Sequence, residues 1–186
     1  MQLAKGLNRE FNIIVAAAGG GEFEEKIKKA GIKFLSVELD KQLSIRPILQ
    51  LKNIMLENSI DIVHSQGARA DFFSRFAGRI AGVDNILCTI TMPVEGFDVG
   101  FIKKKIYRIF DHMSERYSSC FVVVSEALER MLNEKRKISD KQIVRIYNGI
   151  ELDRYSPLSD ISRLKDQFEI PDDAQVVGYF GRLVWQ

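Results

Sequence analysis

The stretch that decides the fold is IDIVHSQGARADFFSRFAGRIA, residues 60–81. Its first five residues are rich in β-branched side chains, which predicts a buried strand at 60–64. From Ala68 to Ala81 the apolar side chains recur at the spacing of one helical face. Because a strand followed directly by a helix is the repeating unit of parallel sheets, the stretch predicts an α/β fold. The residues expected on the buried helical face are Phe72, Phe73, Phe76, Ala77 and Ile80.

The same alternation of strand and helix extends in both directions along the chain. Short apolar runs predict further strands at 11–17, 33–37, 85–91, 121–124 and 142–147. Amphipathic stretches predict helices at 22–30, 45–58 and 102–117, and another that begins after Ser125. No hairpin signal separates the strands, so we expect a Rossmann-like, doubly wound parallel sheet with helices on both faces. In the 102–117 helix the inward residues should be Ile102, Ile106, Ile109, Phe110 and Met113.

The two ends of the chain differ from a complete domain of this kind. Residues 1–10 predict a helix with no strand before it, so the expected sheet lacks its first strand. Residues 157–168 predict a linker and a helix, and residues 175–180 predict a strand that ends at Gly181 and Arg182. We therefore expect a Rossmann-like domain at 1–152, a linker and helix at 153–170, and the first strand of a second domain at 171–186.

Composition narrows the class of protein. The chain has 186 residues, 46% hydrophobic and 28% charged, which is typical of a globular domain. A net charge of +2 does not favour nucleic-acid binding. Cys88 and Cys120 lie in apolar runs and predict buried thiols rather than a disulfide framework. With no membrane-spanning run and no signal peptide in the sequence, we expect a cytoplasmic protein.

Four segments, taken in order, resemble family 4 retaining glycosyltransferases of the GT-B fold. They are DIVHSQGARA at 61–70, VVVSEAL at 122–128, VRIYNGIE at 144–151 with YSP at 155–157, and VGYFGRL at 177–183. The resemblance implies that this chain holds the acceptor side of such an enzyme. It also implies that most of the nucleotide-sugar site lies in a second domain, so we expect little or no transfer activity from the chain by itself.

The resemblance also assigns residues to the site. It places Gly181 and Arg182 on the diphosphate of the donor, where a fixed cation stabilises the charge that develops on the leaving group. His64 would meet the acceptor at the carboxyl edge of the sheet, where open α/β folds bind ligands. The family often has a second histidine after the next strand, but Thr91 and Met92 stand there, which weakens the catalytic assignment of His64. The other residues expected to line the acceptor cleft are Gly67, Arg69, Ser125, Asn148 and Gly149.

Several of these residues also have a purely structural interpretation. Ser125 predicts a helix N-cap, and Asn148 with Gly149 predicts a turn in which both residues tolerate a positive φ. His112 predicts a structural or surface residue, and Gly19 to Gly21 a plain turn. The sequence contains no metal-ligand spacing, and we expect no metal and no cofactor besides the nucleotide diphosphate sugar as co-substrate.

A basic, aromatic-rich segment suggests where a lipid-linked acceptor would be presented. Lys103, Lys104, Lys105 and Arg108 flank the apolar stripe of the 102–117 helix. Such a helix can lie on the anionic inner face of the cytoplasmic membrane, or its charges can be the solvated side of an ordinary core helix. The acceptor itself is left open between a lipid-linked, a saccharide and a small-molecule compound.

Two rival functions remain at this point. A sugar-nucleotide 2-epimerase has the same fold, but it needs acid and base groups for proton transfer at carbon, and no carboxylate–histidine cluster stands out. The other rival is a non-catalytic sugar- or nucleotide-binding remnant.

Overall fold

The computed structural model describes residues 2–39, 44–92, 101–150, 152, 162–171, 173–179 and 181. It divides into two compact units, Met1–Tyr147 and Asn148–Gln186. Arg182, predicted to bind the donor diphosphate, lies outside the described residues, and the side chains of Lys103 and Lys104 lie outside them as well.

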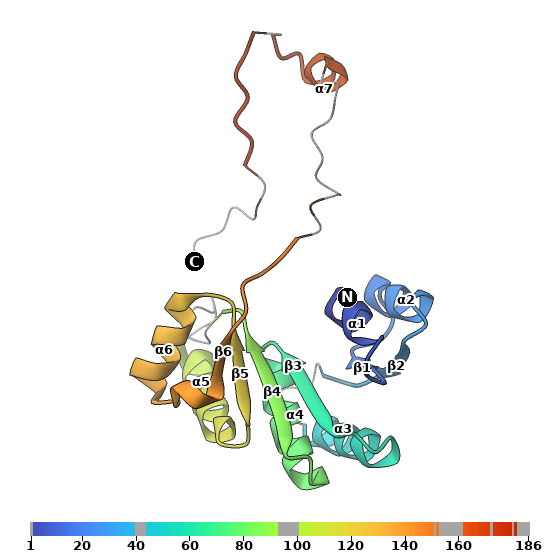
Figure 1. Ribbon diagram of the computed structural model, residues 1–186, viewed down its shortest axis with the longest axis vertical. Coiled ribbons are helices and arrows are strands. Elements are labelled where there is room, and N and C mark those ends of the chain that lie inside the picture. Colours follow the sequence, from blue (N-terminus) through green and yellow to red (C-terminus); the bar gives the residue numbers. More distant parts are fainter. Residues whose placement is uncertain are drawn as a thin grey trace. The chain divides into compact units, whose positions relative to one another are not determined.

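Helices and strands alternate through the first unit (Figure 1). In chain order the elements are α1 (Gln2–Leu7), β1 (Ile14–Ala17), α2 (Glu22–Lys29), β2 (Lys33–Ser36), α3 (Arg46–Glu57), β3 (Ile62–Gln66), α4 (Ala68–Ala81), β4 (Asn85–Ile90), α5 (Phe101–Glu115), β5 (Cys120–Val123), α6 (Glu126–Arg136), the 3-10 turn η2 (Asp140–Gln142) and β6 (Ile143–Arg145). The second unit contains α7 (Ser162–Gln167).

All strand pairs in the described residues are parallel, as the sequence predicts. They form two sheets, one with the order β1-β2 and one with the order β3-β4-β5-β6. The register in the larger sheet pairs His64 with Leu87 and Thr89 with Val122. The prediction of an α/β fold with parallel strands is confirmed, but the strands are divided between two sheets instead of forming one.

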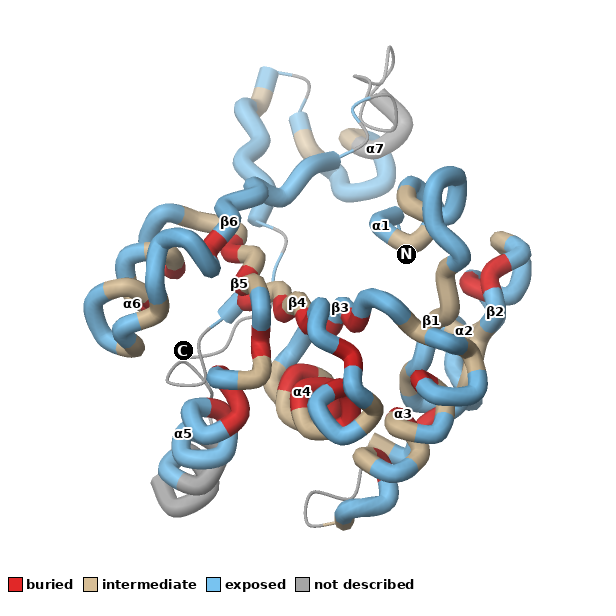
Figure 2. Tube along the Cα trace, turned by 60° about the horizontal axis from the view of Figure 1, so that its bottom comes forward, coloured by how far each residue is buried: buried red, intermediate tan, exposed pale blue. Residues whose placement is uncertain are grey.

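The core lies on one face of the larger sheet, beneath α4. Inward positions of β4 and β5 are filled by Ile86, Cys88, Phe121 and Val123, all at most 2% exposed. Gly78 of α4 lies directly on this layer, since a Cβ there would come 2.7 Å from Cδ1 of Ile86. A larger residue at position 78 would therefore require the buried Ile86 side chain to shift. Figure 2 shows the buried residues of α4 beside the strands.

The buried face of α4 differs from the prediction. Phe73 and Ala77 are buried as expected, but Ile80 is 56% exposed. Phe72 and Phe76 are only half-buried and pack edge to face with each other. The core side of the helix also carries polar residues, namely Asp71, Ser74 and Arg75.

Helix α5 is turned around relative to the prediction. Ile109, Phe110 and Met113 were expected inside but are 48%, 41% and 51% exposed. The inward positions of α5 are taken instead by Asp111, Ser114 and Glu115. Their burial is favourable because Arg75 of α4 and Arg136 of α6 supply hydrogen-bond and charge partners. The inward positions predicted for Ile102 and Ile106 lie outside the described side chains.

The strand predicted at 175–180 is not formed at residues 174–179, which have no regular secondary structure. Val177 is 97% exposed. A strand is stabilised by hydrogen bonds to a neighbour, and no described residue pairs with this segment. This explains why a sequence with strong β-propensity remains irregular here.

Candidate acceptor site at the carboxyl edge of the sheet

The carboxyl ends of β3, β4, β5 and β6 lie along one edge of the larger sheet, because the four strands are parallel. Three residues singled out in the sequence follow β3 or β5 along this edge: Gly67, Arg69 and Ser125. Open α/β sheets bind ligands at this edge, outside the ends of the strands. The edge is therefore the candidate functional site of the first unit.

His64 lies in the middle of β3, two residues before the strand ends, rather than at its end as predicted. Its Nε2 lies 2.7 Å from Oγ1 of Thr89 on the neighbouring strand β4. The residue as a whole is exposed, yet its imidazole is partly enclosed, and this burial lowers the pKa of His64. A neutral imidazole with one nitrogen held by a hydroxyl can offer its other nitrogen to a ligand as donor or acceptor.

The turn from β3 into α4 is shaped by Gly67. This residue has φ +99°, a conformation that side chains with a Cβ rarely adopt, and a Cβ here would meet no described atom within 4 Å. Backbone strain and not lack of space therefore selects glycine. Its carbonyl accepts a hydrogen bond from the amide of Asp71 at 2.8 Å. Arg69 follows in the first turn of α4 and is exposed, so its guanidinium is accessible to an anionic ligand.

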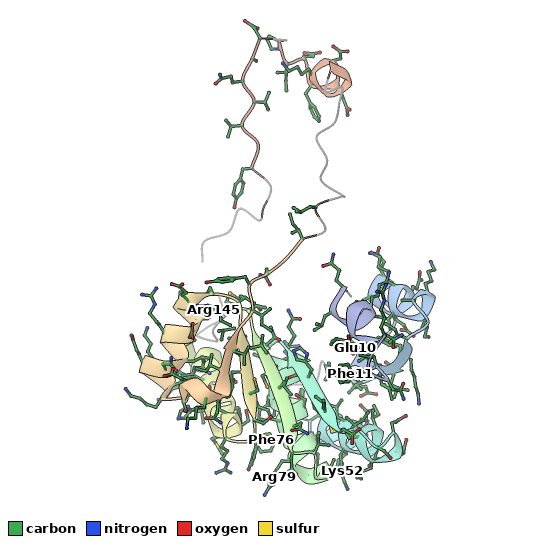
Figure 3. All side chains as sticks on the ribbon, in the orientation of Figure 1. Glu10, Phe11, Lys52, Phe76, Arg79 and Arg145 are labelled. Atoms are coloured by element: carbon green, nitrogen blue, oxygen red, sulfur yellow. The ribbon has the colours of Figure 1, made fainter. Side chains whose placement is uncertain are left out.

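The turn from β5 into α6 is capped as the sequence predicts. Ser125 is the N-cap of α6, and its Oγ accepts a hydrogen bond from the amide of Leu128 at 3.3 Å. Nearby lies Arg145, at the end of β6 (Figure 3). It donates a hydrogen bond to Glu129 of α6 at 2.6 Å. Its guanidinium also lies 5.5 Å from the ring centre of the exposed Tyr147.

The remaining predicted site residues belong to the second unit. Asn148 and Gly149 are exposed and irregular. Neither has a positive φ, so the predicted left-handed turn is not formed. The strand β6 ends at Arg145, earlier than predicted, and residues 146–150 have no regular secondary structure. Gly181 is exposed beside Tyr179, whose hydroxyl would lie 2.8 Å from a Cβ at that position.

A buried polar network behind the site was not predicted from the sequence. Ser65, next to His64, donates from Oγ to Oδ1 of Asp71 at 2.6 Å. Arg75 donates from Nε to Sγ of Cys88 at 3.2 Å and from Nη1 to Oδ1 of Asp111 at 2.7 Å. The one sequence signal for this network is the polar set that interrupts the apolar face of α4: Asp71, Ser74 and Arg75.

The pKa values of the groups in this network favour a structural role over a catalytic one. Burial raises the pKa of Asp71 to about 6, against the opposing effect of the hydrogen bond from Ser65. Burial also raises the pKa of the Cys88 thiol, which keeps it protonated and a poor nucleophile. Cys88 is buried and Cys120 half-buried, and both are free thiols. His112, predicted as a structural or surface residue, is exposed and pairs with Glu115 at 2.9 Å.

Comparison with known proteins identifies the family. The model of Glycosyltransferase Family 4 matches residues 1–154, most of the chain. The chain belongs to this family. A relative is the Escherichia coli enzyme UDP-Gal:alpha-D-GlcNAc-diphosphoundecaprenol alpha-1,3-galactosyltransferase, to which the chain is 20% identical over 168 residues. The aligned region covers 86% of this chain and 42% of that enzyme.

Solved glycosyltransferase structures share the fold of this family 4 chain. A glycosyltransferase from Rickettsia africae ESF-5 has a TM-score of 0.67 at 20% sequence identity. The matched region covers 92% of this chain and 45% of the Rickettsia protein. The Anabaena protein HepE in complex with UDP-glucose has a TM-score of 0.68 at 17% sequence identity. The matched region covers 89% of this chain and 44% of HepE. The chain therefore spans less than half the length of these relatives, and the likeness supports a GT-B glycosyltransferase architecture.

Two negative findings complete the description of the family 4 chain. Among the described residues, no three His, Cys, Asp or Glu side chains are grouped so that they could hold a metal ion. In the same part of the chain no helix is long and apolar enough to cross a membrane.

Proposed function

We propose that this chain forms the acceptor-side half of a glycosyltransferase that moves a sugar from a nucleotide diphosphate sugar to an acceptor, with retention of anomeric configuration. The observation that carries the proposal is the family match over residues 1–154, because it covers the carboxyl edge of the sheet with Gly67 and Ser125 and the strand that carries His64. The E. coli relative uses a diphosphate-linked lipid, so we favour a lipid-linked acceptor in cell-envelope polysaccharide synthesis over a free saccharide or a small molecule.

Acceptor binding would centre on the turn between β3 and α4. The imidazole of His64 offers a hydrogen bond to an acceptor hydroxyl, and the exposed guanidinium of Arg69 offers charge to an acceptor phosphate. Gly67 brings the backbone of the turn close to the ligand, since it carries no side chain. Ser125, Asn148 and Gly149 are the further cleft residues that we propose.

The donor would be held mainly outside this part of the protein. HepE binds UDP-glucose, so a uridine diphosphate sugar is the natural first donor to test. We assign Gly181 and Arg182 to its diphosphate, because a guanidinium matches phosphate oxygens and stabilises the leaving group as its charge grows. In this proposal fixed cations and orientation supply the catalysis, and no metal is required.

The reversed orientation of α5 supports the proposal of a membrane contact through this helix. Ile109 and Met113 expose apolar surface on this helix, and Lys105 and Arg108 are exposed beside them. Apolar side chains flanked by cations are the pattern of a helix that lies on an anionic membrane surface. Such contact would bring the site to a lipid-linked acceptor at the inner face of the cytoplasmic membrane.

Vesicle co-sedimentation tests the membrane contact. We expect the chain to bind phosphatidylglycerol vesicles but not pure phosphatidylcholine vesicles, and we expect added salt to weaken its binding to phosphatidylglycerol. Met113→Glu should reduce binding several-fold, whereas Leu56→Glu, an equally exposed apolar residue of α3, should not. Equal loss in both variants, or no binding to anionic vesicles, would remove α5 as a membrane contact.

Acceptor binding is tested by NMR titration with a soluble analogue of N-acetylglucosamine diphosphate linked to a short lipid. We expect the His64 ring signals to shift, and His64→Ala to weaken binding by up to about tenfold, the upper end of the effect of one lost hydrogen bond to a hydroxyl. His112→Ala is the matched control, because it removes the other histidine. Shifts confined to His112 would place the acceptor elsewhere.

A further inference from the structure

The imidazole of His64 is held by a residue that is not its direct partner in the sheet. Strands β3 and β4 lie side by side (Figure 1), and their register pairs His64 with Leu87 and Gln66 with Thr89. The ring nevertheless reaches diagonally across the pair, because its Nε2 lies 2.7 Å from Oγ1 of Thr89. Alternate residues of a strand share a face, so both side chains lie on the face opposite the buried Cys88.

This diagonal contact brings the ring toward the carboxyl edge of the sheet. His64 lies two residues before the end of β3, whereas Thr89 lies one residue before the end of β4. Since a strand rises about 3.3 Å per residue, Thr89 is about 6 to 7 Å nearer this edge than Leu87. The contact explains how a histidine in the middle of a strand can serve a site at the end of that strand.

The hydroxyl of Thr89 is well suited to hold a ring. Threonine is β-branched, so its χ1 is restricted and its hydroxyl has a defined direction. Within the described part of the chain this hydroxyl has no hydrogen-bond partner besides His64, and Nδ1 of His64 has none. A hydroxyl both donates and accepts, so it binds Nε2 in either neutral tautomer. Nδ1 is therefore the ring nitrogen left for a ligand.

A neutral histidine gains most from such a contact. Partial burial lowers the pKa of His64, so the ring is mostly neutral at pH 7 and has one donor and one acceptor nitrogen. The χ2 torsion of histidine is broad and roughly two-fold, so a ring without a partner exchanges the places of its nitrogens. Fixing the ring before the ligand arrives lowers the entropic cost of binding.

From these observations we propose that Thr89 is a positioning residue, which holds Nε2 of His64 so that the ring lies toward the carboxyl edge and Nδ1 is reserved for a hydroxyl of the acceptor. The identity of the ligand rests on the proposed function, whereas the hold on the ring is a property of the chain alone.

Ring-nitrogen NMR of the chain without ligand tests the hold, at a pH well above the midpoint of the ring. We expect Thr89→Val, which removes the hydroxyl at nearly constant volume, to move the Nε2 signal of His64 toward that of a free imidazole. Thr89→Ser should restore the signal. Thr91→Val is the matched control, because Thr91 is exposed and follows β4, and it should leave the signal in place.

The ring signals of His112 and circular dichroism report whether each variant is folded. If the valine variant does not fold, Thr89→Ala repeats the measurement without the hydroxyl and without added volume. A His64 signal that is the same in the unmodified chain and in a folded variant without the hydroxyl would overturn the proposal.

A double-mutant cycle with the N-acetylglucosamine diphosphate lipid analogue tests the link to the ligand. We expect Thr89→Val to weaken binding several-fold, and by no more than His64→Ala does. In the His64→Ala background the same substitution should have no further effect, because Thr89 acts through the ring. An equal loss in both backgrounds would overturn the proposal, since Thr89 would then contact the ligand itself.

The two measurements separate this inference from the proposed function. Acceptor binding that depends on His64 but not on Thr89, with unchanged ring signals, would refute the positioning role and leave the function standing. Ring signals that respond to Thr89 in a chain that binds no acceptor analogue would support the hold on the ring and count against the proposed function.

Discussion

Arg75 of α4 and Asp111 of α5 form an ion pair at 2.7 Å in which the arginine side chain is fully buried. Asp111 also accepts a hydrogen bond from Arg136 of α6 at 2.6 Å, and Arg136 pairs with Glu115 as well. Buried ion pairs therefore connect helices α4, α5 and α6 at a place where apolar contacts are usual. A buried pair of this kind is costly to break because the remaining partner stays charged and desolvated.

Removing Asp111 should destabilise the domain strongly. We expect Asp111→Ala to lower the free energy of unfolding by about 3 to 5 kcal/mol, measured by urea denaturation, because the buried guanidinium of Arg75 loses its carboxylate partner and Arg136 keeps only Glu115. Glu129→Ala removes the more exposed pair with Arg145 and should cost at most about 1 kcal/mol. Similar losses in the two variants would contradict the role of the buried network.

The buried carboxyl of Asp71 should make stability depend on pH. Its folded-state pKa of about 6 lies above the ordinary value of 3.8, so between these values the folded chain binds more protons than the unfolded chain. The contribution of this group is therefore fully present below pH 3.8 and is lost as the pH rises toward 6.

Asp71→Asn tests that dependence, since an amide keeps an acceptor for Ser65 but cannot ionise. At about 1.4 kcal/mol per pH unit, we expect the variant to gain roughly 1 to 3 kcal/mol at pH 7, as part of the gain is offset by the lost attraction to Arg75. At pH 4 the two proteins should be nearly equal in urea denaturation. A variant that is less stable at pH 7 would show that the ionised carboxylate is stabilising.

The N-cap of α6 should have a measurable effect of its own. Ser125→Ala removes the acceptor for the amide of Leu128 and should cost about 1 kcal/mol in thermal or urea unfolding. Ser139→Ala, which caps only the three-residue η2, should cost less. If Ser125→Ala leaves stability unchanged, ligand contact becomes the better explanation of this serine.

The imidazole of His64 should titrate below its ordinary value. We expect an NMR titration to give a midpoint under 6.5, because partial burial disfavours the charged ring. Stability from this group is present above pH 6.5 and is lost as the pH falls. The resonance can be assigned with His64→Ala, and a midpoint above 6.5 would indicate a nearby negative charge instead.

Apolar periodicity and turn residues in the sequence were sufficient to predict most of the helices and strands. They did not predict the buried polar network between α4, α5 and α6. The helix at 68–81 and the strand that follows it were predicted closely, because apolar periodicity and Gly82 define them locally. The orientation of α5 was wrong, because its apolar stripe is stronger than its polar stripe in the sequence. Only the partners on α4 and α6, Arg75 and Arg136, make burial of Asp111 favourable, and no local pattern contains that information.

The site was predicted in the same uneven way. Ser125 follows from the rule for helix N-caps and Gly67 from the family resemblance, and the structure places both at the carboxyl edge. The contact of His64 with Thr89 depends on the register between β3 and β4, which a single sequence does not contain. The segment at 174–179 has the right composition for a strand but lacks a neighbour to pair with.

The most direct test of the central claim is a calorimetric and turnover panel of UDP-, GDP- and ADP-sugars, with the N-acetylglucosamine diphosphate lipid analogue measured beside them. The account predicts that the chain binds the acceptor analogue, binds no donor tightly, and neither transfers nor hydrolyses any of the sugars. Clear turnover, or tight donor binding without acceptor binding, would contradict the assignment of this chain to the acceptor side.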